Sequence, residues 1–240
     1  MARLALWGFV LPFALAVFTV LAMFRAYWIP SGSMKPALLV GDYVLANRLA
    51  YGFPELFCII GTCQGDMGLL GRDVTRGDVA TFRHPISGQH YVKRIVGLAG
   101  DRLQMRAGRL FLNEELATGQ TDGFFTETYN TDDGYIGCSN GAVSIGAVCE
   151  KQRAKETLPG GRSYAVLHFA QSNLDEIEIF TVPAGHVFVM GDNRDNSVDS
   201  RVAIEMAGIG FVPLERMVGR VDLIVMSLRG EKGRFWKWVE

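Results

Sequence analysis

The sequence has almost no net charge and few cysteines or histidines. Its 240 residues include 24 Lys and Arg against 25 Asp and Glu, which gives a formal net charge of −1. This balance lacks the basic excess typical of proteins that bind nucleic acids, so we expect no nucleic-acid partner. No C-x-x-C pair and no histidine pair with zinc spacing are present. We therefore expect neither a metal site nor another cofactor.

The four cysteines are Cys58, Cys63, Cys138 and Cys149. An even number in an exported domain favours two disulfides, Cys58–Cys63 and Cys138–Cys149, each closing a short loop. Four free thiols are the alternative, and they would fit a cytosolic domain better. The sequence alone leaves the pairing open.

Beyond residue 24, no long segment shows the roughly 3.6-residue apolar period of an amphipathic helix. Short apolar segments alternate with turns instead, and a hairpin is expected around Ala107-Gly108-Arg109. We therefore expect a mainly β, mostly antiparallel domain. Two stretches depart from this pattern: residues 53–72 are rich in glycine and apolar residues, and residues 118–162 are polar. The low apolar content of the second stretch predicts a surface elaboration rather than core.

An uncharged apolar run covers Leu4–Phe24, close to the roughly 20 residues that a helix needs to cross hydrocarbon. A cleaved secretory signal is the alternative, but its apolar core is shorter, roughly 7–15 residues, and ends at a small-x-small site. Here the run ends in the bulky segment 23–28, so we favour a transmembrane anchor. Residues 1–3 would form a short cytoplasmic tail, and the C-terminal domain would lie on the other side of the membrane.

Two serines, Ser31 and Ser33, flank a glycine just beyond this run. A serine hydroxyl becomes a good nucleophile only when a base takes its proton. Lys93 lies in a strand-like segment, where it would share an apolar face with Tyr91 and Ile95. Burial on that face would lower the lysine pKa and provide a neutral amine as general base.

Two other interpretations stay open on these residues alone. Lysine is common on exposed edge strands, where it prevents aggregation, and by pattern alone this interpretation of Lys93 is favoured. A Ser-His-Asp arrangement with His84 or His90 as the base is weakly supported, because no Gly-x-Ser-x-Gly sequence surrounds Ser33. Arg94, beside the lysine, is expected to point outward.

A second polar cluster, residues 191–201, reads GDNRDNSVDSR and follows an apolar strand. Many short polar side chains in succession favour a loop with internal hydrogen bonds. A calcium loop is the alternative. However, the acids Asp192, Asp195 and Asp199 lack the alternating ligand spacing, and the mid-loop glycine is missing. We expect instead a network that braces a neighbouring site.

Together these segments resemble the type I signal peptidases, which are membrane-anchored Ser-Lys endopeptidases. The resemblance implies that residues 25–240 form an antiparallel β-sheet peptidase domain of that type, with a variable β-rich insertion at about 100–182. The motifs that carry the resemblance begin at Pro30 (PSGSMKP), Gly41 (GD), Arg76 (RGD), Tyr91 (YVKR) and Gly191 (GDNRDNSVDSR).

The resemblance implies roles for single residues. Ser33 would be the nucleophile and Lys93 its general base, which favours the buried interpretation of the lysine. The Ser31 hydroxyl and the Ser33 backbone amide would form the oxyanion hole, where one donor contributes roughly 3–4 kcal/mol. The supporting residues would be Ser197, which orients the lysine, and the ion pair of Asp199 and Arg201.

The implied substrate is an exported preprotein, bound as an extended strand and cut after a small-x-small site. Shallow apolar pockets would exclude large side chains one and three places before the cut. The implied location is the bacterial inner membrane, with lipid around the anchor, a cytoplasmic N-terminus and a periplasmic catalytic domain. The residues expected to line the pockets are Ile29, Met34, Val44, Thr81, Tyr91 and Val92.

The sequence departs from the family pattern in three places. One span instead of two precedes the serine, the stretch 53–72 is unusual, and residues 202–209 intervene before Gly210. Two alternative functions follow. One is a peptidase that matures a single class of exported substrate, and the other is an anchored envelope domain that binds without hydrolysis. The combination of Ser33, Lys93 and Ser197 argues against the second.

Overall fold

The structure is a computed structural model, and two expectations from the sequence concern residues that it does not describe. Cys58, Cys63 and the whole stretch 53–72 lie outside it, as does most of the apolar run 4–24. Within the described part, no helix is both long enough and apolar enough to cross a membrane. The expected anchor therefore stays a prediction. The described residues are 10–15, 20, 23–51, 74–130, 137–229 and 233–239.

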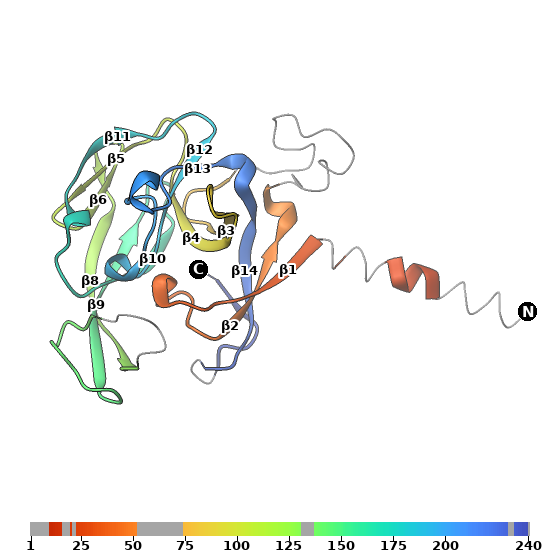
Figure 1. Ribbon diagram of the computed structural model, residues 1–240, viewed down its shortest axis with the longest axis horizontal. Coiled ribbons are helices and arrows are strands. Elements are labelled where there is room, and N and C mark those ends of the chain that lie inside the picture. Colours follow the sequence, from red (N-terminus) through yellow and green to blue (C-terminus); the bar gives the residue numbers. More distant parts are fainter. Residues whose placement is uncertain are drawn as a thin grey trace, which may run out of the picture.

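The largest sheet has eight strands in the order β1-β2-β14-β3-β4-β12-β13, with β15 paired to β14 (Figure 1). Neighbouring strands run antiparallel throughout, which confirms the expected mainly β, antiparallel fold. The strands are β1 (Phe24–Trp28), β2 (Asp42–Asn47), β3 (Val79–Arg83), β4 (His90–Gly97), β12 (His186–Met190), β13 (Val212–Pro213), β14 (Met217–Ser227) and β15 (Lys237–Trp238).

Two smaller antiparallel sheets are built from the chain between β4 and β12. One has the order β10-β9-β8 and the other β11-β5-β6-β7. Figure 1 shows them together at the left of the view, away from β1 and β14. Their strands are β5 (Arg102–Arg106), β6 (Arg109–Leu112), β7 (Glu115–Leu116), β8 (Thr118–Thr128), β9 (Val148–Thr157), β10 (Ser163–His168) and β11 (Ile177–Thr181).

The hairpin expected around residues 107–109 is confirmed. Strands β5 and β6 pair up to Arg106 and Arg109, and the two residues between them, Ala107 and Gly108, have φ values of 47° and 71°. Positive φ at both central residues is what a two-residue turn needs to match the twist of its strands.

The prediction of a polar surface elaboration at residues 118–162 is partly wrong. This stretch contains the long hairpin of β8 and β9, and several side chains of β9 are buried. Cys149 and Lys151, which share one face of the strand, are 0% exposed, and Glu156 on the other face is 4% exposed. Low apolar content gave the wrong expectation because two of these buried side chains, Lys151 and Glu156, are charged.

Helical structure near the site consists of single 3₁₀ turns, one of which lines a cavity. The insertion at residues 202–209 contributes Ala203, Ile204 and Glu205 to the wall of a cavity of about 540 Å³, which Phe180 and Phe188 also line. The 3₁₀ turns are η1 (Gly32–Met34), η2 (Arg48–Tyr51), η3 (Asn173–Asp175), η4 (Arg194–Asn196), η5 (Ile204–Met206) and η6 (Leu214–Arg216).

Candidate active site

The turn that carries Ser33 is the 3₁₀ turn η1, directly after β1. The backbone N–H of Lys35 donates to Gly32 O at 3.1 Å, and that of Leu38 donates to Met34 O at 2.9 Å. Met34 and Leu38 are almost fully buried in an apolar cluster to which β2 and β14 also contribute side chains. The apolar side chains after the serine therefore anchor the turn, while the Ser33 side chain stays partly accessible.

Lys93 lies in β4 and reaches Ser33. Its Nζ donates a hydrogen bond to Ser33 Oγ at 2.6 Å, and the residue is only 3% exposed. Its cross-strand partner is Ala80. Burial lowers the pKa of Lys93 to about 8; the charge of Asp199 acts against this shift, and that of Arg201 adds to it. The burial excludes the exposed-strand interpretation of this lysine.

Arg94 does not point into solvent, so the expectation that it faces outward is wrong. It is 0% exposed, and its Nε and Nη2 donate to the two oxygens of Asp192 at 2.8 and 2.7 Å. Its guanidinium also lies 4.1 Å from the centre of the Tyr164 ring. Tyr164 belongs to β10, so the three-stranded sheet β10-β9-β8 covers Arg94. No local pattern around Arg94 predicts this burial.

The loop after β12 holds the serine turn through Asn193, which sequence reasoning did not single out. The Asn193 backbone N–H donates to Ser33 O at 3.1 Å, and its side-chain Nδ2 donates to Gly32 O at 3.0 Å. Gly191 also passes close to the turn, since a Cβ on it would lie 2.6 Å from Ser33 O. The cluster 191–201 therefore contacts the serine turn directly.

Asp199 and Arg201 form a buried ion pair beside the lysine. Arg201 Nε donates to Asp199 Oδ1 at 2.9 Å, and the Gly191 backbone N–H donates to Asp199 Oδ2, also at 2.9 Å. Burial alone would raise the pKa of Asp199, but Arg201 and these hydrogen bonds hold it below its ordinary value. Asp199 is therefore ionised at neutral pH and acts electrostatically on Lys93.

The other two serines are placed differently. Ser31 Oγ lies 3.4 Å from Ser33 Oγ, and Ser31 is exposed. The Ser197 hydroxyl is buried and has no hydrogen-bond partner among the described residues, so the structure shows no bond from it to Lys93. It lies against Gly191, where an added Cβ would overlap it.

The residues expected to line substrate pockets fall into two groups. Ile29, Met34, Val44 and Val92 pack in one apolar cluster, whereas Tyr91 packs in another. The separation arises because successive residues of a strand point to opposite faces. Thr81 pairs with Val92 across β3 and β4 and is also buried.

His84 is occupied by backbone partners and is buried. Its Nε2 lies 3.2 Å from Gly208 O, and its Nδ1 accepts from the backbone N–H groups of Ile86 and Ser87. His90 lies at the exposed end of β4 against the Tyr27 ring. Within the described ranges, no group of three or more His, Cys, Asp or Glu residues could hold a metal ion.

Comparisons with known proteins identify the family of this chain. A sequence model of the family described as signal peptidase, peptidase S26, matches residues 2–226. A signal peptidase I of Rickettsia prowazekii (strain Madrid E) is 31% identical over 235 residues, covering 93% of this chain and 79% of that protein. One from Pseudomonas aeruginosa is 35% identical over 207 residues, covering 84% and 64%.

A solved structure of a signal peptidase I from Enterococcus faecalis V583 aligns with 62% of this chain and 97% of that chain, at 25% identity and a TM-score of 0.35. The family match extends over nearly the whole chain, and the relatives align along most of its length. The chain therefore belongs to the signal peptidase family, peptidase S26, and is a hydrolytic enzyme of that family.

Proposed function

We propose that this protein is a membrane-anchored serine endopeptidase that removes N-terminal signal peptides from exported preproteins, with Ser33 as nucleophile and Lys93 as general base. The observation that carries the proposal is the 2.6 Å approach of the buried Lys93 amine to Ser33 Oγ. A buried amine with a pKa of about 8 is neutral in about a tenth of molecules at pH 7 and in about half at pH 8, so a neutral base is available.

In the proposed reaction, neutral Lys93 takes the proton of Ser33 while Oγ attacks the carbonyl carbon of the scissile peptide bond. The tetrahedral intermediate collapses as the Lys93 ammonium gives its proton to the departing amine, leaving an ester on Ser33. Water, deprotonated by the same amine, then hydrolyses the ester and releases the signal peptide. The Ser31 hydroxyl and the Ser33 backbone N–H are the proposed donors to the negatively charged oxygen.

The proposed substrate is an extended segment with small side chains one and three places before the cut. Support comes from the buried apolar side chains next to Ser33, namely Ile29, Met34 and Val44, which leave little room for a large residue. Asp199 and Arg201 are proposed to set the electrostatic potential at the Lys93 amine, and Ser197 is proposed to orient that amine.

The apolar run 4–24 is proposed to anchor the enzyme in the bacterial inner membrane, with the catalytic domain on the periplasmic side. Support comes from the length of the run. An anchor there would place Ser33 near the membrane surface, where the signal segment of a preprotein ends.

The test is cleavage of a panel of purified preproteins, with the cut sites mapped by mass spectrometry. Ser33→Ala and Lys93→Ala should each abolish cleavage, while the control Lys155→Ala should cleave at the wild-type rate, because Lys155 is an exposed lysine of β9. Circular dichroism should show the same fold for all three variants. Near-normal turnover by folded Lys93→Ala would refute the Ser-Lys mechanism, and an inactive wild-type protein would refute the function.

A further inference from the structure

Two buried lysines share one carboxylate beside the serine turn. Lys35 is 4% exposed and Lys151 is 0% exposed. Both donate to Glu127: Lys35 to Oε2, and Lys151 to Oε1 at 2.7 Å. Glu127 belongs to β8, Lys151 to β9 and Lys35 to the segment after η1. The cluster therefore joins the β8–β9 hairpin to the serine turn.

Lys35 is in close contact with the turn that carries Ser33. Its side chain folds over the α-carbon of Gly32, so that a Cβ added there would lie 3.1 Å from Lys35 Cε and 3.3 Å from Cδ. Its backbone N–H donates to Gly32 O. A movement of the Lys35 side chain would therefore displace Gly32 and, with it, the adjacent Ser33.

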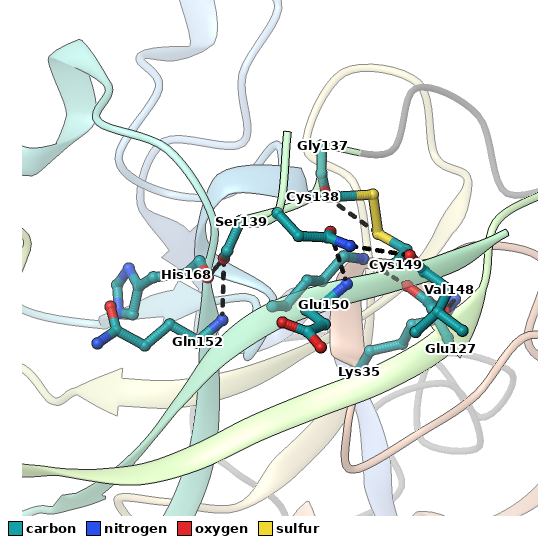
Figure 2. Close-up of a disulfide and its surroundings, with 12 residues drawn as sticks. Lys35, Glu127, Gly137, Cys138, Ser139, Val148, Cys149, Glu150, Gln152 and His168 are labelled. Atoms are coloured by element: carbon teal, nitrogen blue, oxygen red, sulfur yellow. Dashed lines mark hydrogen bonds and ion pairs between the residues drawn. A yellow bond between two sulfur atoms is a disulfide. The ribbon is translucent and has the colours of Figure 1, made fainter. Parts of the chain in front are cut away.

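Glu127 is itself held in place by the hairpin. It pairs across the strands with Cys149, which forms a disulfide with Cys138 (Cα–Cα 5.3 Å), as Figure 2 shows together with Lys35 and Glu127. The segment after Cys138 is also tied to β9, because the Ser139 backbone N–H donates to Glu150 O at 2.6 Å. The carboxylate thus projects from a braced strand end.

We propose that Glu127 is a positioning residue for the peptidase reaction: it fixes Lys35 against Gly32 and so holds Ser33 Oγ at the proton-transfer distance from Lys93. This inference rests on the proposed function. Removal of the carboxylate would leave two buried cations without this partner, and removing one partner of a buried ion pair is strongly destabilising. Movement of the Lys35 side chain toward solvent would relieve part of that penalty. The Lys35 side chain cannot move without releasing its packing over Gly32.

The test is a double-mutant cycle on preprotein cleavage with Glu127→Gln and Lys35→Met. Glu127→Gln should lower kcat about tenfold with little change in KM, since a small misplacement of reacting atoms is costly. In the Lys35→Met background, the same Glu127→Gln change should have almost no effect on kcat, because no lysine is left there to move the turn. Glu127→Asp, which keeps the charge and shortens the reach, should lie between wild type and Glu127→Gln.

The matched control is Asp122→Asn, which removes an exposed carboxylate from the same strand. Asp122 pairs with Arg153 at the surface, where their side chains are 50% and 38% exposed, and its loss should leave kcat unchanged.

Equal effects of Glu127→Gln in both backgrounds would overturn the inference, as would a lower melting temperature with unchanged kcat. If Glu127→Gln cannot be obtained folded, the cycle with Glu127→Asp decides on the same criterion. Wild-type protein that fails to cleave at all would refute the proposed function instead.

Discussion

At the scale of single residues, the protonation state of Lys93 should control the rate. Burial lowers its pKa to about 8, and only the neutral amine can accept the Ser33 proton. We therefore expect kcat/KM to rise with pH through a single step near pH 8 and then level off. Initial rates measured between about pH 6 and pH 10 test this. A profile that falls over this range would contradict a lysine base.

The same burial should cost the folded protein stability. The pKa of Lys93 is lower in the folded state than the ordinary value of 10.5 for an exposed lysine, so the penalty is fully present below about pH 8 and fades as the pH rises toward 10.5. Lys93→Met should therefore raise the free energy of unfolding at pH 7, by on the order of 1–3 kcal/mol, while abolishing cleavage. Urea unfolding at pH 7 and pH 10 measures this. The gain should shrink at the higher pH, and a destabilised variant at pH 7 would contradict the argument.

At the scale of elements, the loop after β12 works as a clamp on the serine turn. Gly191 leaves no room for a side chain, because any Cβ there meets Ser33 O and the Ser197 side chain. Gly191→Ala should therefore displace the turn and reduce kcat by roughly 100-fold. Cleavage rates and thermal unfolding are the measurements.

Gly119→Ala, in β8, is the matched control for this glycine. A Cβ on Gly119 meets nothing within 4 Å, so this variant should keep wild-type kcat and equal or slightly greater stability. Full activity of Gly191→Ala would show that the turn tolerates displacement, and the clamp would then have no role in the reaction.

The β8–β9 hairpin shows why an element can be misjudged from its sequence. Its residues are polar, which usually indicates an exposed surface. In the fold, however, Lys151 and Glu156 point inward, where Glu127 and Arg194 neutralise them. Neither partner is identifiable from a local pattern, since Arg194 lies 38 residues from Glu156.

At the scale of the whole molecule, the site is assembled from segments far apart in the chain. The serine turn precedes β2, the lysine comes from β4, and the Asn193 side chain that holds Gly32 is 161 residues away. Glu127 and Lys35 are 92 residues apart. Each of these contacts depends on the strand order of the eight-stranded sheet and on how the three-stranded sheet β10-β9-β8 packs beside it.

The sequence by itself determined the strand-and-turn character of the domain and the 107–109 hairpin. These follow from local periodicity and turn chemistry, which depend on neighbouring residues alone. Only the tertiary structure decided that Arg94 is buried against Asp192 and that Glu127 joins Lys35 to Lys151. Such pairs form between distant segments, and whether a charged side chain meets a partner or solvent depends on strand register and on sheet packing, which no local pattern contains.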